Sequence, residues 1–249
     1  MINVLINGCN GKMGQEVAKA ISDNNQFNVI SGVDRIDSKT NIFPVYSNTD
    51  GIVEKPDVII DFSSPSYTLN ILEYAKNNKT PIVIATTGFN DNELNKIISY
   101  SQYIPIFKSA NLSISINLML NIVSKISKVL SDADIEIVEK HHNKKVDSPS
   151  GTALLIADTI NETLNNELYY EYSRHSKKES RNKKELGIHS IRGGNIVGEH
   201  SVFFINDDES LELTHNITSR TVFAKGALNA AKFIIDKSNG MYDMKDLIK

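Results

Sequence analysis

The residues best suited to chemistry lie together in the stretch EKHHNKKVDSPSGT, near the middle of the chain. His141 and His142 can titrate near neutral pH, so either of them can act as a general acid. Lys145 adds a fixed cation four residues after His141. The backbone N–H groups of Gly151 and Thr152 stand where a helix is expected to begin, which is a natural seat for an anion. Together these groups predict a small acidic substrate that is protonated during the reaction.

Hydrophobic patterns on both sides of this stretch predict a strand before it and a helix after it. Residues 134–139 alternate as a strand does, and residues 153–164 carry apolar side chains at nearly helical spacing. Ser150 is the expected N-cap of that helix. The alternatives are a solvated polar loop in front of a capped helix, or a metal site. Because no Cys or Glu follows the histidines at a zinc-like spacing, we expect no metal here.

A glycine motif stands near the start of the chain. Gly8-x-x-Gly11-x-x-Gly14 follows an apolar run over 2–7 and precedes a helical pattern over 15–21. Strand, glycine turn and helix form the context of a dinucleotide-binding fingerprint, in which the backbone approaches a pyrophosphate at the helix N-terminus. Because the spacing is GxxGxxG rather than GxGxxG, a glycine turn that binds no ligand stays open as an alternative.

Charged residues follow the second predicted strand, over residues 28–33. Asp34 lies 20 residues after Gly14, and an acidic residue at this place usually holds the ribose hydroxyls of adenosine. Arg35 offers a guanidinium to a 2′-phosphate, and Lys12 could help. The pair predicts that both NADH and NADPH are accepted. The alternative for Arg35 is a charge that only faces solvent.

Strands and helices alternate through the first half of the chain. Further strands are expected at 58–62, 81–84 and 104–107, with helices at 68–77 and 91–101. This alternation is typical of an α/β fold with a doubly wound parallel sheet, whose ligands bind outside the carboxyl ends of the strands. The turns after the last two of these strands are therefore candidates for the nicotinamide side of the cofactor.

The second half is predicted to be an α+β region with a mixed, mostly antiparallel sheet. The expected elements are a long helix at 113–130, strands at 187–192, 196–204 and 210–215, and a last helix at 221–237 that returns to the first domain. The basic segment 173–185 is expected to be a flexible, solvated loop, with a mobile lid or an anion-attracting arm as the alternative. His189, His200 and His215 are expected to be structural, because no partner set is apparent near them.

Composition limits the class of protein. The chain has 249 residues, a net charge of −3 and one cysteine, Cys9. Its length suits one large domain or two smaller ones, and its charge gives no case for binding nucleic acid. The lone cysteine suits a reducing cytosol. Because the N-terminus lacks a basic signal region and no apolar run approaches ~20 residues, we expect a cytoplasmic protein without a membrane segment.

Several motifs, taken together, resemble the dihydrodipicolinate reductase family of lysine and diaminopimelate biosynthesis. They are the glycine loop, ATTGF, SANLSISIN, the run HHxxKxDxPSGTA that starts at His141, RGGNIVGEH and SRTVFAKGAL. The resemblance implies that NADH or NADPH reduces 4-hydroxy-tetrahydrodipicolinate, a small dicarboxylate, to tetrahydrodipicolinate. It also implies a Rossmann-like dinucleotide-binding domain (1–112 and 219–249), a substrate-binding and oligomerisation domain (113–218) and a homotetramer formed through the substrate-domain sheets.

The same resemblance implies roles for individual residues. His141 would be the proton donor, Lys145 a second donor and carboxylate anchor, and His142 a substrate contact. Gly151 and Thr152 would bind a substrate carboxylate. The cofactor would be held by Gly8, Cys9, Asn10, Gly11, Lys12 and Met13 at the pyrophosphate, by Asp34 and Arg35 at the adenosine ribose, and by Ala85, Thr86, Thr87, Ser109, Ala110, Asn111 and Leu112 on the nicotinamide side.

Two other functions stay open at this point. One is another NAD(P)-dependent reductase that acts on a different imine or keto acid. The other is a dinucleotide sensor without catalytic activity. A sensor would need only the cofactor residues, so the set of His141, Lys145, Gly151 and Thr152 argues against it.

Overall fold

The computed structural model describes residues 1–35 and 41–248, and the chain divides into two compact units. Unit 1 comprises Met1–Ile114 and Arg220–Lys249, and unit 2 comprises Ser115–Ser219. The sequence-based boundaries fall at 112/113 and 218/219, and the last residue of the expected first domain, Lys249, lies outside the described residues. In the described part of the chain, no helix combines the length and the apolar character that crossing a membrane requires.

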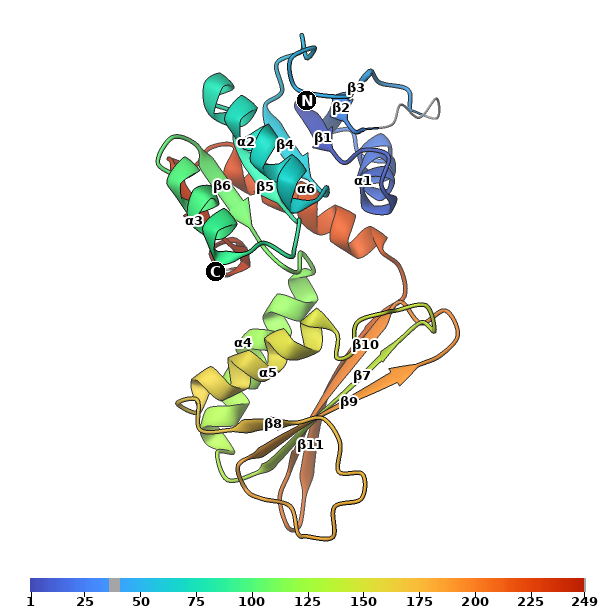
Figure 1. The fold of residues 1–249 in the computed structure, drawn as a ribbon, viewed down its shortest axis with the longest axis vertical. Coiled ribbons are helices and arrows are strands. Elements are labelled where there is room, and N and C mark those ends of the chain that lie inside the picture. Colours follow the sequence, from blue (N-terminus) through green and yellow to red (C-terminus); the bar gives the residue numbers. More distant parts are fainter. Residues whose placement is uncertain (36–40, 249) are drawn as a thin grey trace. The chain divides into compact units, whose positions relative to one another are not determined.

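Unit 1 is built on a seven-stranded sheet (Figure 1). Its strands are β1 (Ile2–Asn7), β2 (Phe27–Val33), β3 (Val45–Tyr46), β4 (Val58–Asp61), β5 (Ile82–Ile84), β6 (Pro105–Lys108) and β12 (Gly240–Tyr242). They lie in the order β12-β6-β5-β4-β1-β2-β3, and all neighbours run parallel. The order 3-2-1-4-5-6 of the first six strands is that of a Rossmann-like doubly wound sheet. The predicted fold class of this half is confirmed.

Helices cover both faces of this sheet. Helices α1 (Lys12–Ser22) and α6 (Thr221–Ile234) pack on one face, and α2 (Pro65–Asn78) and α3 (Asp91–Tyr100) on the other. Successive strand residues point to opposite faces, so Ile6 joins the core with α1 while Leu5 joins the core with α2. Burial on both faces explains why the strands read as continuous apolar runs.

Three short elements of unit 1 were not predicted: β3, β12 and helix α7 (Met244–Leu247). They span two to four residues, which is too short to show a hydrophobic period. β12 exists because its backbone pairs with β6, a partner more than a hundred residues away in the chain.

Unit 2 contains a five-stranded sheet in the order β11-β10-β7-β9-β8. The strands are β7 (Asp134–His141), β8 (Tyr169–Glu171), β9 (Glu185–Arg192), β10 (Gly198–Ile205) and β11 (Ser210–Ile217). β10 pairs antiparallel with β7 and β11, whereas β9 pairs parallel with β7 and β8. The antiparallel pairings together are longer, so the predicted mixed, mostly antiparallel sheet is confirmed. The short strand β8 was not predicted.

Helices α4 (Ile114–Val129) and α5 (Gly151–Thr163) cover one face of this sheet. Buried and half-buried residues alternate along β7, and Ile137 lies in the core with both helices. Because the strand period is two, Glu139 and His141 point to the same face as Ile137. The fold therefore places two titratable groups at the end of a strand, on the side that the helices cover.

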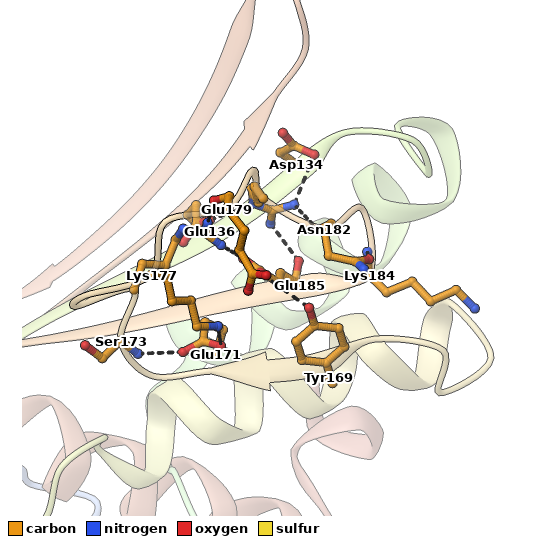
Figure 2. A network of polar contacts seen from close by, with 12 residues as sticks. Asp134, Glu136, Tyr169, Glu171, Ser173, Lys177, Glu179, Asn182, Lys184 and Glu185 are labelled. Atoms are coloured by element: carbon orange, nitrogen blue, oxygen red, sulfur yellow. Dashed lines mark hydrogen bonds and ion pairs between the residues drawn. The ribbon is translucent and has the colours of Figure 1, made fainter.

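The basic segment before β9 is exposed, but acidic residues of the sheet anchor it (Figure 2). Arg181 donates from Nε to Glu136 Oε1 and from Nη1 to Asp134 Oδ1, at 3.0 Å each. Arg174 pairs with Glu185, which is buried and belongs to β9 rather than to the predicted loop. Asp134 and Glu136 belong to β7, which is distant in sequence, so the composition of the segment could not reveal these two partners.

Candidate active site

The glycine loop of unit 1 follows β1 directly. Gly8 has a φ of +81°, and a Cβ at this position would stand 2.8 Å from the carbonyl oxygen of Phe62. This backbone therefore requires glycine. The Gly8 N–H donates to the Val33 carbonyl at 2.8 Å, and α1 begins directly after Gly11. The predicted sequence of strand, glycine turn and helix is present.

A cavity of about 320 Å³ opens beside this loop and beside the carboxyl end of β2. Asp34 lines it, and its Oδ2 accepts a 2.9 Å hydrogen bond from the Asn10 N–H, so the predicted ribose carboxylate and the glycine loop are neighbours. Arg35 lines the same cavity. The remaining lining comes from the glycine loop and from residues that the sequence did not single out: Asn7, Gly8, Gly11, Val33, Phe62, Ser63, Ser64 and Tyr67.

The other side chains of the loop differ in their surroundings. Cys9 is fully buried in the core of unit 1, so it can offer a ligand only its backbone. Met13 packs against the same core. Lys12 is exposed in the first turn of α1.

A buried aspartate, Asp61, organises the carboxyl end of the sheet and was not predicted. Its carboxylate accepts from Asn7 Nδ2 at 2.8 Å, from Ser63 Oγ at 2.5 Å, from Thr68 Oγ1 at 2.6 Å and from Thr86 Oγ1 at 3.0 Å. Burial raises the pKa of Asp61, although these hydrogen bonds oppose the rise. Asp61 thus holds Thr86, one of the predicted cofactor residues, against the end of β4.

The predicted nicotinamide-side residues occupy two adjacent strand ends. Ala85, Thr86 and Thr87 follow β5, and the segment of Ser109, Ala110, Asn111 and Leu112 follows β6. The Ser109 N–H donates to the Ile84 carbonyl at 3.2 Å, which joins the two turns. Thr86, Asn111 and Leu112 are buried, whereas Thr87 and Ala110 are exposed.

In unit 2, α5 begins at Gly151 as the start signal predicts. Ser150 is its N-cap, and the side-chain oxygen accepts from the Ala153 N–H at 3.1 Å. Gly151 and Thr152 therefore occupy the first two helical positions, at the end of the helix dipole that favours anions. Gly151 is exposed and Thr152 is half-buried, so this end of the helix is open to a small anion.

His141 lies at the end of β7 and contacts a buried carboxylate. Its Nδ1 is 2.6 Å from Oε2 of Glu139, which is fully buried. Arg192, opposite His141 on β9, donates to Oε2 at 2.8 Å and to Oε1 at 2.7 Å. Burial alone raises the pKa of Glu139, but the hydrogen bonds from His141 and Arg192 outweigh it and hold the pKa well below its ordinary value. Glu139 is therefore ionised.

Lys145 and His142 lie in the turn that follows β7. The Lys145 N–H donates to the His142 carbonyl at 3.1 Å, which closes the turn. The Lys145 ammonium donates to both oxygens of Asp147, at 2.8 and 2.9 Å. This hydrogen bond lowers the pKa of Asp147. Because Asp147 is exposed, an incoming carboxylate can replace it as the partner of Lys145.

His200 is a buried neighbour of His141 that the sequence reading treated as merely structural. Its Nε2 lies 2.9 Å from Ser150 Oγ, and its ring meets the His141 ring edge-on with centroids 5.2 Å apart. Burial, aided by the charge of His141, lowers the pKa of His200 to about 3. His200 therefore stays neutral and links the helix cap to His141.

This buried histidine makes stability depend on pH in a way that can be measured. The unfolded chain protonates a histidine near pH 6.5, whereas folded His200 resists protonation down to about pH 3. The unfolded state therefore binds more protons in this window, so stability is full above about pH 6.5 and is lost as the pH falls. We expect His200→Gln to reduce the slope of unfolding free energy against pH by ~1.4 kcal/mol per pH unit between pH 6 and 4.5. Denaturant titrations over this range measure the slope, and an unchanged slope would contradict the prediction.

Among the described residues, no group of three or more His, Cys, Asp or Glu side chains is arranged to hold a metal ion. The structure adds Asp61, Glu139, Arg192 and His200 to the sites predicted from sequence. Glu139 lies within the stretch that was singled out, and Arg192 and His200 lie in the RGGNIVGEH motif. The sequence shows the types of these four residues, but it does not show which side chains they contact.

The parallel sheet with its glycine loop, joined to an α+β unit with a histidine–carboxylate pair, defines a two-unit oxidoreductase of the Rossmann type. Residues 2–112 match the family described as "Dihydrodipicolinate reductase, N-terminus", and residues 115–248 match "Dihydrodipicolinate reductase, C-terminus". The chain belongs to the dihydrodipicolinate reductase family.

Full-length relatives agree with this assignment. The chain is 49% identical over 249 residues to the 4-hydroxy-tetrahydrodipicolinate reductase of Caldanaerobacter subterraneus subsp. tengcongensis, covering 100% of this chain and 99% of the relative. It is 48% identical over 247 residues to the protein of the same name from Clostridium tetani, covering 98% and 96%. A dipicolinate-bound dihydrodipicolinate reductase from Paenisporosarcina sp. TG-14 has the same fold, with a TM-score of 0.81, 24% identity and coverage of 98% and 97%.

Proposed function

We propose that the protein reduces 4-hydroxy-tetrahydrodipicolinate to tetrahydrodipicolinate with NADH or NADPH, as a step of lysine and diaminopimelate biosynthesis. The main support is the position of His141. Its ring is paired with an ionised carboxylate and lies near the N-terminus of α5, where Gly151 and Thr152 would bind an anion. The names of relatives that share nearly half of its residues support the choice of substrate.

The first unit suits a dinucleotide for reasons that its own geometry supplies. The positive φ of Gly8 lets the chain turn from β1 into the N-terminus of α1, where a pyrophosphate binds well. Asp34 and Arg35 line the adjoining cavity and would contact the adenosine ribose. Thr86 and Ser109, at the ends of β5 and β6, would face the nicotinamide.

In the second unit, the substrate would be held by its two carboxylates. The N–H groups of Gly151 and Thr152 would bind one of them through charge-assisted hydrogen bonds, and Lys145 would anchor a carboxylate after leaving Asp147. His142, in the same turn, would contact the ring. Bound NADH or NADPH supplies a hydride to C4 of the conjugated C=N–C=C system that forms when the hydroxyl group leaves as water. His141 would then donate its proton to C3 of the resulting enamine, while Lys145 stabilises negative charge.

A coupled assay tests the proposal directly. The synthase that makes 4-hydroxy-tetrahydrodipicolinate is added, and oxidation of the nicotinamide cofactor is followed by absorbance. We expect oxidation that depends on both the synthase and this protein. Oxidation with other cyclic imines or keto acids but not with this dicarboxylate would favour the rival reductase, and cofactor binding without any turnover would favour the sensor.

Dual use of the cofactor is a separate prediction. Asp34 favours a free ribose diol, whereas Arg35 and Lys12 can accept a 2′-phosphate. We expect kcat/KM for NADH and NADPH to differ by less than about a thousandfold, or ~4 kcal/mol. Both are measured at one ionic strength, because salt screens contacts to the phosphate. Arg35→Ala should lower kcat/KM for NADPH about tenfold and leave that for NADH nearly unchanged, as expected for one lost charged hydrogen bond.

We also propose that the protein works in the cytoplasm as a homotetramer. The buried lone thiol of Cys9 suits a reducing compartment. On the sheet of unit 2, Ile191 and Ile205 are exposed apolar side chains, which a partner subunit could cover. Sedimentation equilibrium tests the assembly, and a monomer at micromolar concentration would contradict it.

A further inference from the structure

The carboxylate of Glu139 is saturated with hydrogen bonds. Oε1 accepts from Arg192 Nη2 at 2.7 Å and from the Ser150 N–H at 3.1 Å. Oε2 accepts from Arg192 Nη1 at 2.8 Å and lies 2.6 Å from His141 Nδ1. A carboxylate has about four acceptor positions, and all of them are used here. Glu139 is therefore fixed between β9, the cap of α5 and His141.

This arrangement determines which nitrogen of His141 exchanges protons. An ionised carboxylate can only accept, so Nδ1 must carry the hydrogen in the contact with Glu139. The other nitrogen, Nε2, lies over Gly198, where a Cβ would approach it to 3.1 Å. Glycine at this position keeps free the space beside Nε2 that a side chain of residue 198 would fill.

We propose that Glu139, braced by Arg192, is a positioning residue that holds the His141 ring with Nδ1–H toward the carboxylate and Nε2 as the proton-donating atom. The inference deepens the proposed function and rests on it for its effect on turnover. The orientation of the ring itself does not depend on which substrate is reduced. A partner of this kind fixes both the tautomer and the direction of an imidazole, as carboxylates do beside metal-bound histidines.

The other face of the same sheet provides a matched comparison. Glu136, also on β7, lies 2.8 Å from His189 Nε2 and accepts from Arg181 Nε at 3.0 Å. This second set of glutamate, histidine and arginine has the same chemistry, but His189 is substantially exposed and lies away from the N-terminus of α5. Glu136→Gln is therefore the control for Glu139→Gln, once sedimentation shows that both variants assemble as the parent does.

The test combines a spectroscopic and a kinetic measurement on the full chain. Magic-angle-spinning ¹⁵N spectra of histidine-labelled protein distinguish protonated from bare ring nitrogens, and His141→Gln assigns the His141 signals. Donation from Nε2 starts from the ring protonated on both nitrogens and leaves neutral His141, which in the parent is expected to show Nδ1 protonated and Nε2 bare. Glu139→Gln should convert it to a mixture of tautomers and lower kcat by about 10- to 100-fold, with KM for the substrate within about threefold. Glu136→Gln should alter only the His189 signals and keep kcat within about twofold.

Two further variants keep the inference testable if Glu139→Gln fails to fold. Glu139→Gln combined with Arg192→Gln removes both charges and leaves no unpaired guanidinium, and it should show the same mixture of tautomers. Arg192→Lys keeps the charge but loses the bidentate contact with Glu139, and it should give an intermediate fall in kcat. Unchanged His141 spectra in the folded Glu139 variants overturn the inference. Altered spectra with parental kcat support the positioning role and instead overturn the assignment of His141 as proton donor.

Discussion

Replacing His141 by glutamine is expected to lower kcat for the dicarboxylate by at least about a hundredfold. The reason is that glutamine keeps the size and polarity of the side chain but cannot donate a proton to carbon, and a positioned general acid contributes 10²–10⁴-fold. We expect kcat to fall by a larger factor than KM rises, because the proton is needed in the transition state rather than in the bound ground state. Steady-state kinetics in the coupled assay measure both parameters.

The control for this variant is His175→Gln. His175 is exposed in the basic segment, and its loss should leave kcat within about twofold of the parent. Binding of NADH, followed by its fluorescence, should be the same for His141→Gln and the parent, because the proposed cofactor residues lie in the other unit. If His141→Gln keeps more than about half of the parental kcat, the loss is far smaller than the contribution of a general acid, and His141 is not the donor.

Replacing Lys145 by alanine should lower kcat/KM by at least about a hundredfold. The change removes the cation that we propose to anchor a substrate carboxylate and to stabilise developing charge, and the loss of one such electrostatic donor typically costs 10²–10³-fold. It also releases Asp147, whose carboxylate then repels the dicarboxylate substrate. Measurement at two salt concentrations separates this repulsion, because salt screens it.

Lys144→Ala is the matched control for Lys145→Ala. Lys144 is the neighbouring residue in the same turn, carries the same charge and is exposed. Its removal alters the net charge equally, so a specific role for Lys145 requires that Lys144→Ala keep kcat/KM within about threefold. Equal losses in the two variants would mean that general attraction of the anionic substrate, and not an anchor at Lys145, explains the effect.

Local patterns predicted the elements that depend on nearby residues. The first strand was expected at 2–7, and β1 spans Ile2–Asn7. The N-cap at Ser150 was predicted because a cap and its helix are adjacent in sequence. The glycine loop was predicted for the same reason, since its strand, turn and helix follow one another. These features need no knowledge of the tertiary fold.

The contacts that complete the site depend instead on strand pairing. Arg192 reaches Glu139 across 53 residues of sequence, because β9 lies parallel to β7 with His141 opposite Arg192. His200 meets Ser150 across 50 residues because β10 pairs with the other edge of β7. Asp61 gathers partners from three separate segments. Apart from the local contacts of Asp61 with Ser63 and Thr68, these contacts depend on how distant strands pair, which no single stretch of sequence contains.

The division of unit 1 between the two ends of the chain has a consequence for how the protein is made on the ribosome. Helix α6, which helps to cover one face of the parallel sheet with Ala227, Ala231 and Ile234, is synthesised after all of unit 2. Until it emerges, Ile60, Val83 and Phe107 on β4, β5 and β6 lack the cover that α6 provides, although β1 to β6 are already translated and α1 covers β1 and β2 on the same face. The whole of unit 2 is complete before then and can fold first. Nascent chains that stall before α6 therefore expose an apolar sheet face, which makes them substrates for chaperones or proteases.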